Sequence, residues 1–226
     1  RLTNPFYRLR GVKDKIKTVL VRSEFEKKYM VEGFEFPEEK CKIVRLSCGI
    51  TSPDSLPEKE PFCLHVSLLC DKRKNVKRLI DAAKKYNFRL VLAGKLRNQE
   101  EVNRLKSWIG NANNIEYCGF ISEEEKINLY SRAKVFALPS INEGVGIVAL
   151  EAAAMECDIV ITKFGGPHEY YKDKARIVDP YNIDEIGKAV KYFIDGNTFQ
   201  PGLAKFVNKE YSLYNIGKIL ASTITF

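Results

Sequence analysis

The fold is decided by the stretch Leu138-Pro139-Ser140-Ile141-Asn142-Glu143-Gly144-Val145-Gly146-Ile147-Val148-Ala149-Leu150-Glu151-Ala152-Ala153-Ala154. It is preceded by Lys134 to Leu138, a short apolar run rich in strand-forming residues, which Pro139 and Ser140 end. Two glycines then lead into Ile147 to Met155, a run of strong helix formers. The pattern predicts a strand, a glycine loop and a helix.

The glycine loop predicts a site for a phosphate group. A helix that begins on glycines presents free backbone N–H groups and the positive end of its dipole. Because Gly144 and Gly146 have no Cβ atom, a bulky anion can approach the backbone closely. We therefore expect Gly144, Val145 and Gly146 to hold a phosphate or diphosphate.

Two acidic residues flank this loop. Glu151 interrupts an otherwise apolar helix, where a carboxylate is costly unless it meets a polar partner. At about 1.5 Å per residue it lies roughly 7 to 8 Å along the helix from Gly146, about the span from a diphosphate to a ribose. Glu143 lies on the other side of the loop. Residue types alone leave open an ordinary strand–helix unit in which Glu151 pairs with a structural Lys or Arg.

The pattern Pro-Ser-x-x-Glu-Gly-x-Gly-Ile-Val-x-Leu-Glu-Ala resembles the nucleotide-sugar site of retaining glycosyltransferases with the GT-B fold, specifically family 4. The similarity extends through about residues 62 to 195. The resemblance implies that Glu143 contacts the donor sugar and that Glu151 contacts the ribose hydroxyls. It also implies a donor such as a UDP- or GDP-sugar, with no metal or other cofactor.

The same resemblance assigns roles to other turns. Lys74-Asn75 matches the family's Lys-Asn at a helix start, where the lysine grips the diphosphate and assists catalysis. The family's arginine partner falls on Leu68 or Leu69, so Lys72, Arg73 or Lys95 would have to substitute. Backbone groups of Phe120 and Ile121 would contact the base. The turn Gly165-Gly166 with Glu169 would shape the wall near Glu151.

Composition excludes several classes of protein. No apolar run approaches the roughly 18 to 20 residues of a membrane span, and the polar start carries no signal peptide. The net charge of +8 is concentrated in residues 1–22, which hold seven Lys or Arg and one Asp. This segment is either a solvated basic stretch or a contact for an anionic membrane surface. No nucleic-acid-binding motif accompanies it.

The cysteines and histidines do not predict a metal site. The six cysteines show no close-paired spacing, and His65 and His168 are the only imidazoles in the sequence. Most of the cysteines fall in apolar, strand-like runs, where a free thiol behaves as a small buried hydrophobe. A reducing cytoplasm is therefore the expected compartment. His168 is expected in a turn and not as a base.

Strands alternate with helices after a linker at Thr51 to Pro61, which predicts an α/β fold with a Rossmann-like parallel sheet covered by helices on both faces. The expected strands are Phe62–Leu69, Phe88–Ala93, Ile115–Cys118, Lys134–Leu138, Asp158–Thr162 and Arg176–Val178. The expected helices are Asn75–Tyr86, Gln99–Ile109, Glu123–Arg132, Ile147–Met155 and Ile183–Ile194, with one or two more over Leu203–Leu220.

We divide the chain into three parts. Residues 1–51 are expected to be the end of an N-terminal acceptor domain whose main body is missing, and they include a strand at Thr18–Val21 and a helix capped by Ser23. The resemblance implies that residues 52–205 form the donor-binding domain. It also implies that residues 206–226 form a C-terminal helix that crosses back toward the N-terminal domain. The strand at Thr18–Val21 would lose its sheet partners, and the loose linker favours self-association, as a homodimer, over docking within the chain.

The resemblance implies a glycosyltransferase that moves a sugar from a nucleoside diphosphate sugar to a sugar or lipid-linked acceptor, with retention, in polysaccharide, glycolipid or glycoconjugate synthesis. The chain is expected in the cytoplasm, either free or on the inner membrane face, and alone it should be inactive. Two alternatives stay open: a non-catalytic module that binds or pairs through a nucleotide sugar, and a nucleotide-sugar epimerase.

Overall fold

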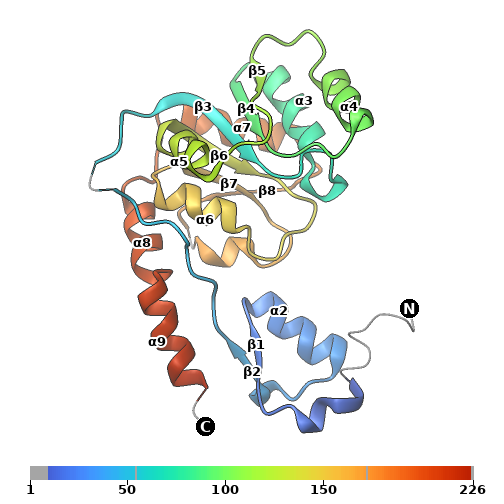
Figure 1. Cartoon of the computed structure of the whole chain (residues 1–226), viewed down its shortest axis with the longest axis vertical. Coiled ribbons are helices and arrows are strands. Elements are labelled where there is room, and N and C mark those ends of the chain that lie inside the picture. Colours follow the sequence, from blue (N-terminus) through green and yellow to red (C-terminus); the bar gives the residue numbers. More distant parts are fainter. Residues whose placement is uncertain (1–9, 54, 172, 225–226) are drawn as a thin grey trace.

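Six parallel strands form the larger of two sheets in the computed structural model, which describes residues 10–53, 55–171 and 173–224. Their spatial order is β5-β4-β3-β6-β7-β8 (Figure 1). The strands are β3 (Glu60–Val66), β4 (Arg89–Ala93), β5 (Ile115–Tyr117), β6 (Ala133–Leu138), β7 (Asp158–Thr162) and β8 (Arg176–Val178). We call this part, residues 60–210, the six-stranded domain.

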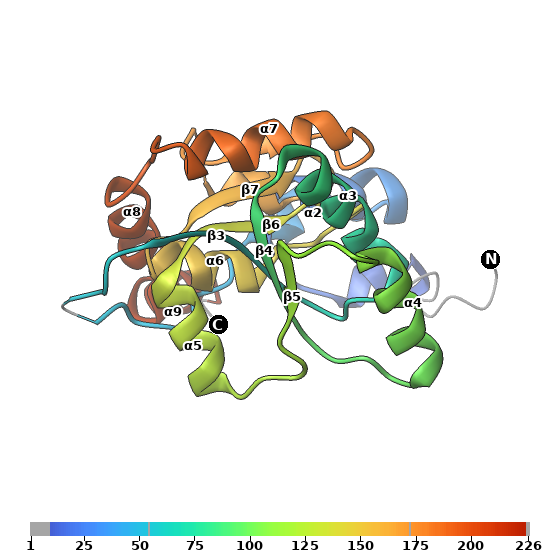
Figure 2. The same cartoon turned by 90° about the horizontal axis from the view of Figure 1, so that it is seen from above.

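Helices cover both faces of the large sheet (Figure 2). The helices are α3 (Val76–Tyr86), α4 (Gln99–Ile109), α5 (Glu123–Arg132), α6 (Ile147–Ala154), α7 (Ile183–Ile194), α8 (Gly202–Glu210) and α9 (Leu213–Thr223). One apolar core joins α3, α4 and α7 to one face, and a second core joins α5, α6 and α8 to the other. The predicted α/β fold with a Rossmann-like sheet is confirmed.

The first strand of this domain is displaced from its prediction. It covers Glu60–Val66 instead of Phe62–Leu69. Glu60 can begin a strand because Arg89 and Arg132 neutralise its carboxylate. Leu69 is fully buried but lies in the turn after the strand. An apolar run marks burial, and it does not separate a buried strand from a buried turn.

The order of the strands creates a switch point between β3 and β6. From β3 the chain proceeds outward through β4 to β5, and from β6 it proceeds outward in the other direction through β7 to β8. β3 and β6 are parallel neighbours, with Cys63 opposite Val135 and Leu64 opposite Phe136. The chain therefore continues from β3 and β6 to helices on opposite faces of the sheet, α3 and α6, and such a point is where sheets of this kind bind ligands.

Residues 10–43, which we call the N-terminal segment, contain the smaller sheet. Their elements are η1 (Arg10–Lys15), β1 (Val19–Val21), α2 (Glu24–Lys28), η2 (Tyr29–Gly33), η3 (Glu38–Lys40) and β2 (Cys41–Ile43). The predicted strand at Thr18–Val21 and the cap at Ser23 are confirmed, and Ser23 Oγ accepts a hydrogen bond from Glu26 N at 3.0 Å. The expectation that β1 lacks a partner strand is wrong, because β2 pairs with it in parallel.

The N-terminal segment docks on the six-stranded domain. The carboxylate of Glu169 accepts hydrogen bonds from the backbone N–H groups of Glu24, at 2.8 Å, and Phe25, at 3.0 Å. The hydroxyl of Tyr170 donates to Arg22 O at 2.8 Å. The expectation that the linker is too loose for docking within the chain is therefore wrong, while self-association stays a prediction. The calls on residues 1–9 lie outside the described residues.

The last helix within the described residues is α9, which extends from α8 below the six-stranded domain, on the side where the N-terminal segment lies (Figure 1). None of its described residues is buried. Within the described residues, no helix has the length and apolar character needed to cross a membrane.

Candidate functional site

The predicted glycine loop lies at the switch point. It follows β6 and ends at Gly146, which precedes α6 with φ +72°. A Cβ atom on Gly146 would lie 2.9 Å from Leu138 Cδ2, so both the backbone conformation and the space favour glycine. The first N–H groups of α6 therefore follow the glycine loop that leaves β6, as the sequence predicts for an anion site.

Lys74 and Glu143 meet across the switch point. Lys74 Nζ lies 2.7 Å from Glu143 Oε2, and Ser140 Oγ donates a hydrogen bond to the same oxygen at 3.2 Å. The two side chains keep 21% and 17% of their surface exposed. Lys74 comes from η4 (Lys72–Lys74) after β3, and Glu143 comes from the loop after β6. Two predicted site residues that are far apart in sequence thus lie in contact.

Asn75 fixes the loop that carries Lys74. Its side-chain amide donates hydrogen bonds to Pro139 O at 2.9 Å and to Pro180 O at 2.7 Å. Its backbone adopts φ +59°, a left-handed conformation that asparagine tolerates better than most residues. Ile141 N adds a further link, to Arg73 O at 2.7 Å. The loops after β3 and β6 are therefore held together as one unit.

A neutral histidine lies beneath this unit. His65 is fully buried in β3; its Nδ1 lies 2.7 Å from Ala137 O and its Nε2 lies 2.7 Å from Ser67 Oγ. A carbonyl oxygen only accepts, so Nδ1 carries the proton and Nε2 accepts from the serine hydroxyl. Burial lowers the pKa of His65 to about 4, so the ring is uncharged near neutral pH. The sequence singled out this residue only as a poor metal ligand.

Glu151 has the polar partners that its position in α6 requires. Its Oε2 atom lies 3.1 Å from Lys126 Nζ and 3.2 Å from the hydroxyl of Tyr130, both on α5. Burial opposes the charged form of Lys126, but its hydrogen bonds to Glu123 and Glu151 outweigh burial and raise its pKa. Burial, followed by the charge of Glu151, raises the pKa of Tyr130, which therefore stays a hydroxyl donor. The structural pairing that the residue types left open is thus present.

The Gly-Gly-x-x-Glu turn lies against the other glutamate. A Cβ atom on Gly165 would lie 1.9 Å from Glu143 O, and the backbone at Gly165 has φ +91°. Glu143 and Gly165 also form a parallel β-bridge. The expectation that this turn borders Glu151 is therefore wrong: β7 and β6 are neighbours, so the loops that follow them meet at Glu143.

The remaining predicted residues lie at the same end of the sheet or close to it. Phe120 and Ile121 lie in the turn between β5 and α5, and the Phe120 side chain is 79% exposed. Lys72 and Lys95 are exposed, and Arg73 pairs with Asp71 at 2.9 Å. Of the two positions where the family arginine was expected, Leu69 is buried and Leu68 is 45% exposed.

Sequence reasoning missed the contribution of the N-terminal segment. A Cβ atom on Gly144 would lie 3.6 Å from Arg22 Nη2, so the guanidinium lies against the glycine loop. Arg22 is paired with Glu26, whose Oε2 accepts hydrogen bonds from Arg22 N and Nε, both at 2.9 Å. The sequence shows only that Arg22 lies directly before the helix cap Ser23. Nothing in the sequence indicates that Arg22 lies near Gly144.

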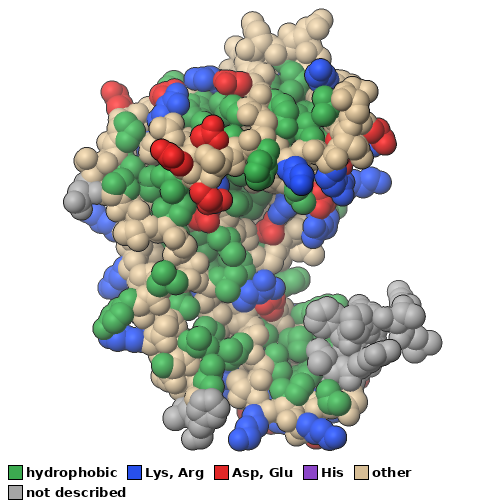
Figure 3. Space-filling model, in the orientation of Figure 1, with side chains coloured by type: hydrophobic (Ala, Val, Ile, Leu, Met, Phe, Trp, Pro, Cys, Tyr) green, Lys and Arg blue, Asp and Glu red, His purple; other side chains and the backbone are tan. Residues whose placement is uncertain are grey.

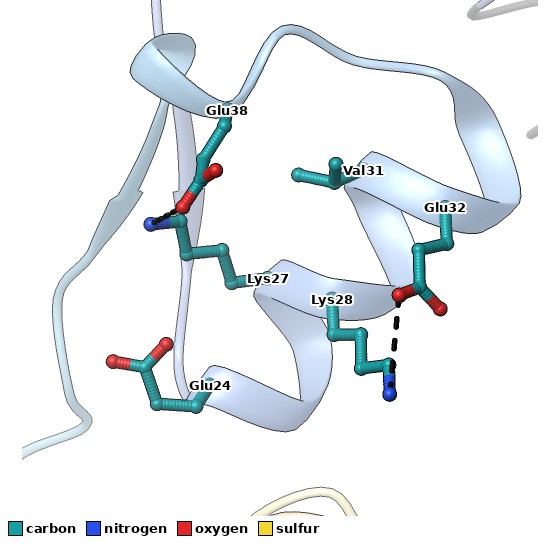
Figure 4. A pocket seen from close by; sticks show the side chains of 6 residues that line it. All are labelled: Glu24, Lys27, Lys28, Val31, Glu32 and Glu38. Atoms are coloured by element: carbon teal, nitrogen blue, oxygen red, sulfur yellow. Dashed lines mark hydrogen bonds and ion pairs between the residues drawn. The ribbon is translucent and has the colours of Figure 1, made fainter.

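Another hollow, of about 200 Å³, lies on a different face of α2 (Figure 4). Its charged side chains pair with one another: Lys27 with Glu38 at 2.9 Å, and Lys28 with Glu32 at 3.9 Å. It contains none of the predicted site residues. Among the residues that the structure describes, no group of three or more His, Cys, Asp or Glu side chains is arranged to hold a metal ion.

The fold is found in known proteins. The chain is 25% identical over 200 residues to the O-antigen chain mannosyltransferase B of Escherichia coli, and the match covers 76% of this chain and 50% of that protein. A glycosyltransferase structure from Rickettsia africae superposes with a TM-score of 0.80 at 22% identity, over 97% of this chain and 66% of that one. Anabaena Alr3699/HepE, solved with UDP and glucose, superposes with a TM-score of 0.78 at 16% identity, over 97% of this chain and 67% of that one.

The chain spans half the length of the Escherichia coli mannosyltransferase that it matches. The family model described as "Glycosyl transferases group 1" matches residues 51–210, a range that contains Lys74, Glu143 and Glu151. The chain therefore belongs to the group 1 family of glycosyltransferases.

Proposed function

We propose that this glycosyltransferase takes its sugar from a nucleoside diphosphate sugar and transfers it to an acceptor hydroxyl with retention of anomeric configuration. Membership of the group 1 family supports the transfer. The structural similarity to a protein solved with UDP and glucose supports a nucleotide-sugar donor. The similarity to an O-antigen chain mannosyltransferase supports a role in polysaccharide or glycoconjugate synthesis.

The observation that carries the proposal is the contact of Lys74 with Glu143 beside the N-terminus of α6. In our proposal the diphosphate lies on the backbone N–H groups of Gly144, Val145 and Gly146. Lys74 has three N–H donors, so it can hold Glu143 and a phosphate oxygen together. Glu143 then faces the sugar, and a charge that develops on the departing diphosphate meets a cation and a helix N-terminus.

The nucleoside end of the donor would lie along α6 toward α5. Lys126 and Tyr130 both contact Oε2 of Glu151. Within the described part of the chain, Oε1 of Glu151 has no hydrogen bond. We assign this oxygen to the ribose hydroxyls. The turn at Phe120 and Ile121 precedes α5, the helix that carries Lys126, so backbone groups of this turn are assigned to the base.

In the proposed reaction, the bond between the anomeric carbon and the diphosphate oxygen breaks, and a bond to the acceptor oxygen forms. The nucleoside diphosphate leaves, and the proton of the acceptor hydroxyl passes to it or to solvent. We assign charge neutralisation to Lys74, Arg22 and the helix N-terminus, without a metal ion. Arg22 would thereby supply the cation that Leu68 and Leu69 lack, because its guanidinium lies against Gly144.

The proposal includes a further domain. The chain spans half of its Escherichia coli relative, so we assign most of the acceptor-binding surface to sequence outside this chain. We place the protein in the reducing cytoplasm, where free thiols such as the buried Cys63 and Cys157 are stable, either free or on the membrane surface through basic residues 1–22.

A second candidate is a module that binds nucleotide sugars without transferring them. Leucine at the positions where the family carries its diphosphate-binding arginine favours it. Formation of a glycosylated product by the longer protein separates the two, since only the transferase gives product.

Calorimetric titration tests the donor site directly. We expect the chain to bind UDP or GDP and the corresponding sugars, because the glycine loop, Lys74 and both glutamates lie within one domain. No binding across the uridine, guanosine and adenosine series would contradict the donor site. Turnover by this chain alone with an added acceptor would contradict the assignment of the acceptor site to a further domain.

A further inference from the structure

Lys126 on α5 lies between two carboxylates of unequal exposure. Its Nζ atom lies 3.1 Å from Oε2 of Glu151, whose side chain is 12% exposed, and 2.7 Å from Oε2 of Glu123, whose side chain is 83% exposed. The side chain of Lys126 is itself 12% exposed. Glu123 is the first residue of α5, just after the turn that contains Phe120 and Ile121. One ammonium group thus joins the start of α5 to the carboxylate inside α6.

Tyr130 donates a second hydrogen bond to the same oxygen of Glu151. Its hydroxyl lies 3.2 Å from Oε2 of Glu151. The Tyr130 side chain is fully buried, and its ring packs edge-on against Phe136 with the ring centroids 5.7 Å apart. The backbone carbonyl of Tyr130 accepts a hydrogen bond from Lys59 Nζ at 2.9 Å. A buried ring and a largely buried lysine therefore hold Oε2 of Glu151 in place.

The other carboxylate oxygen of Glu151, Oε1, is open to solvent. Among the described residues, the buried side-chain polar atoms that lack a hydrogen-bond partner are Asp158 Oδ2, His168 Nδ1 and the hydroxyl oxygen of Tyr171. Glu151 Oε1 has no hydrogen bond within the described part of the chain, and it is not one of these buried atoms. A carboxylate oxygen accepts two hydrogen bonds, so Oε1 can receive both neighbouring hydroxyls of a ribose.

The surroundings of Lys126 are acidic. α5 begins with three consecutive glutamates at positions 123–125. In the space-filling view, Asp and Glu side chains gather over the region of α5 (Figure 3). Lys126 is one cation in contact with two carboxylates, whereas Lys74 contacts one and lies beside the positive end of the α6 dipole. A diphosphate is therefore favoured at the glycine loop, and an uncharged part of the donor is favoured beside Lys126.

We propose that Lys126 is a positioning residue for the ribose: together with Tyr130 it holds Oε2 of Glu151, so that Oε1 alone receives the ribose hydroxyls. The inference rests on the proposed function, which assigns Glu151 to the ribose. Lys126 does not touch the ligand, and it acts through Glu151. Without Lys126 the carboxylate is held by Tyr130 alone and has to be ordered when the ligand binds, which weakens binding. The affinity that Lys126 supplies therefore depends on the ribose hydroxyls.

The test compares a nucleoside diphosphate with its 2′,3′-dideoxy form by direct and displacement calorimetry on the full chain. The base is the one, among uridine, guanosine and adenosine, whose diphosphate binds the wild-type chain most tightly. We expect Lys126→Met to weaken the ribose form about fivefold, the loss expected for one hydrogen bond, and to change the dideoxy form by less than about twofold. Tyr130→Phe keeps the buried ring and removes the hydroxyl, and it should give the same pattern.

Two further variants serve as controls, and thermal melting establishes that each variant is folded. Lys191→Met removes a lysine that pairs with Asp195 on α7, and it should change neither affinity. In a chain that carries Glu151→Gln, the further change Lys126→Met should cause no additional loss for the ribose form, because the positioned carboxylate is already absent. If Lys126→Met does not fold, Tyr130→Phe decides the question.

The outcomes separate this inference from the proposed function. If Lys126→Met weakens the ribose and dideoxy forms equally, or leaves both unchanged, the positioning role is overturned and the donor site stands. If the wild-type chain binds the two forms equally, Glu151 does not bind the ribose, and the inference fails while the diphosphate site stands. If the wild-type chain binds no nucleoside diphosphate, the proposed function fails, and the inference fails with it.

Discussion

Glu143 and Glu151 lie on one strand–loop–helix unit, yet their surroundings differ. Glu143 is in the loop after β6, borders an open cleft, and meets a lysine from another loop of the same site. Glu151 lies inside α6, is 12% exposed, and is bound to two side chains of the neighbouring helix α5. The comparison teaches that a carboxylate in a binding loop can be free to exchange partners, whereas one in a helix also holds two helices together.

The largest expected difference concerns stability. Glu151→Ala leaves Lys126 and the Tyr130 hydroxyl without their shared partner in a largely buried place. We expect the free energy of unfolding to fall by about 3 kcal/mol. Glu143→Ala should lower it by about 1 kcal/mol or less, because Lys74 can turn toward solvent. Urea denaturation measures both, and equal losses would contradict the structural role of Glu151.

The second prediction concerns how the free energy of unfolding depends on pH through a residue beneath Glu143. The Glu143 region is supported by neutral His65, whose pKa is lowered by burial to about 4 from an ordinary value of 6.5. Between these values the unfolded chain binds a proton that the folded chain does not, so stability falls as the pH decreases from 6.5 to 4. The total loss from this residue is about 3 kcal/mol at 1.36 kcal/mol per pKa unit.

Urea denaturation at pH 7 and at pH 4.5 measures this effect. Because carboxylates also titrate, the comparison is with His65→Asn, which keeps an N–H donor and does not titrate. The wild-type chain should lose more stability than the variant between the two values. Equal losses would mean that His65 is protonated in the folded protein.

The third prediction tests the cation at the glycine loop. Arg22→Gln should weaken UDP or GDP about tenfold, the size expected for one charge-assisted hydrogen bond, and should leave the free nucleoside unaffected. Arg176→Gln provides a matched control, because Arg176 lies on β8 and stacks on Tyr192. Calorimetry measures both variants. If Arg22→Gln binds the diphosphate as tightly as the wild-type chain, then Lys74 is the side-chain cation that holds the diphosphate, and Arg22 does not contribute.

The smallest change in ligand affinity is expected for a substitution in the turn that is assigned to the nucleotide base. Phe120→Ala removes a side chain that is 79% exposed, while the proposed contacts come from the backbone of Phe120 and Ile121. Nucleoside diphosphate affinity should therefore change by less than about twofold. A loss above tenfold would show that the ring itself stacks on the base.

Local pattern was sufficient for most helices and strands of the six-stranded domain, with β3 as an exception. Gln99–Ile109, Glu123–Arg132 and Asp158–Thr162 have the predicted bounds, because caps such as Ser122 and clear apolar periods mark their ends. The contact of Lys74 with Glu143 follows from the rule that parallel strands end at one edge. The sequence could not place Arg22 against Gly144 or Gly165 against Glu143, since both contacts depend on how distant segments pack. The partners of Glu151 were left open for the same reason.

The central assignment is that Glu151 binds the ribose of the donor and that Glu143 binds its sugar. Calorimetric titration of Glu143→Gln and Glu151→Gln with a nucleoside diphosphate and with its sugar measures it directly, and thermal melting confirms that each variant is folded. We predict that Glu151→Gln weakens both ligands and that Glu143→Gln weakens mainly the nucleotide sugar. Equal losses for both variants on both ligands would contradict the assignment of Glu151 to the ribose and Glu143 to the sugar.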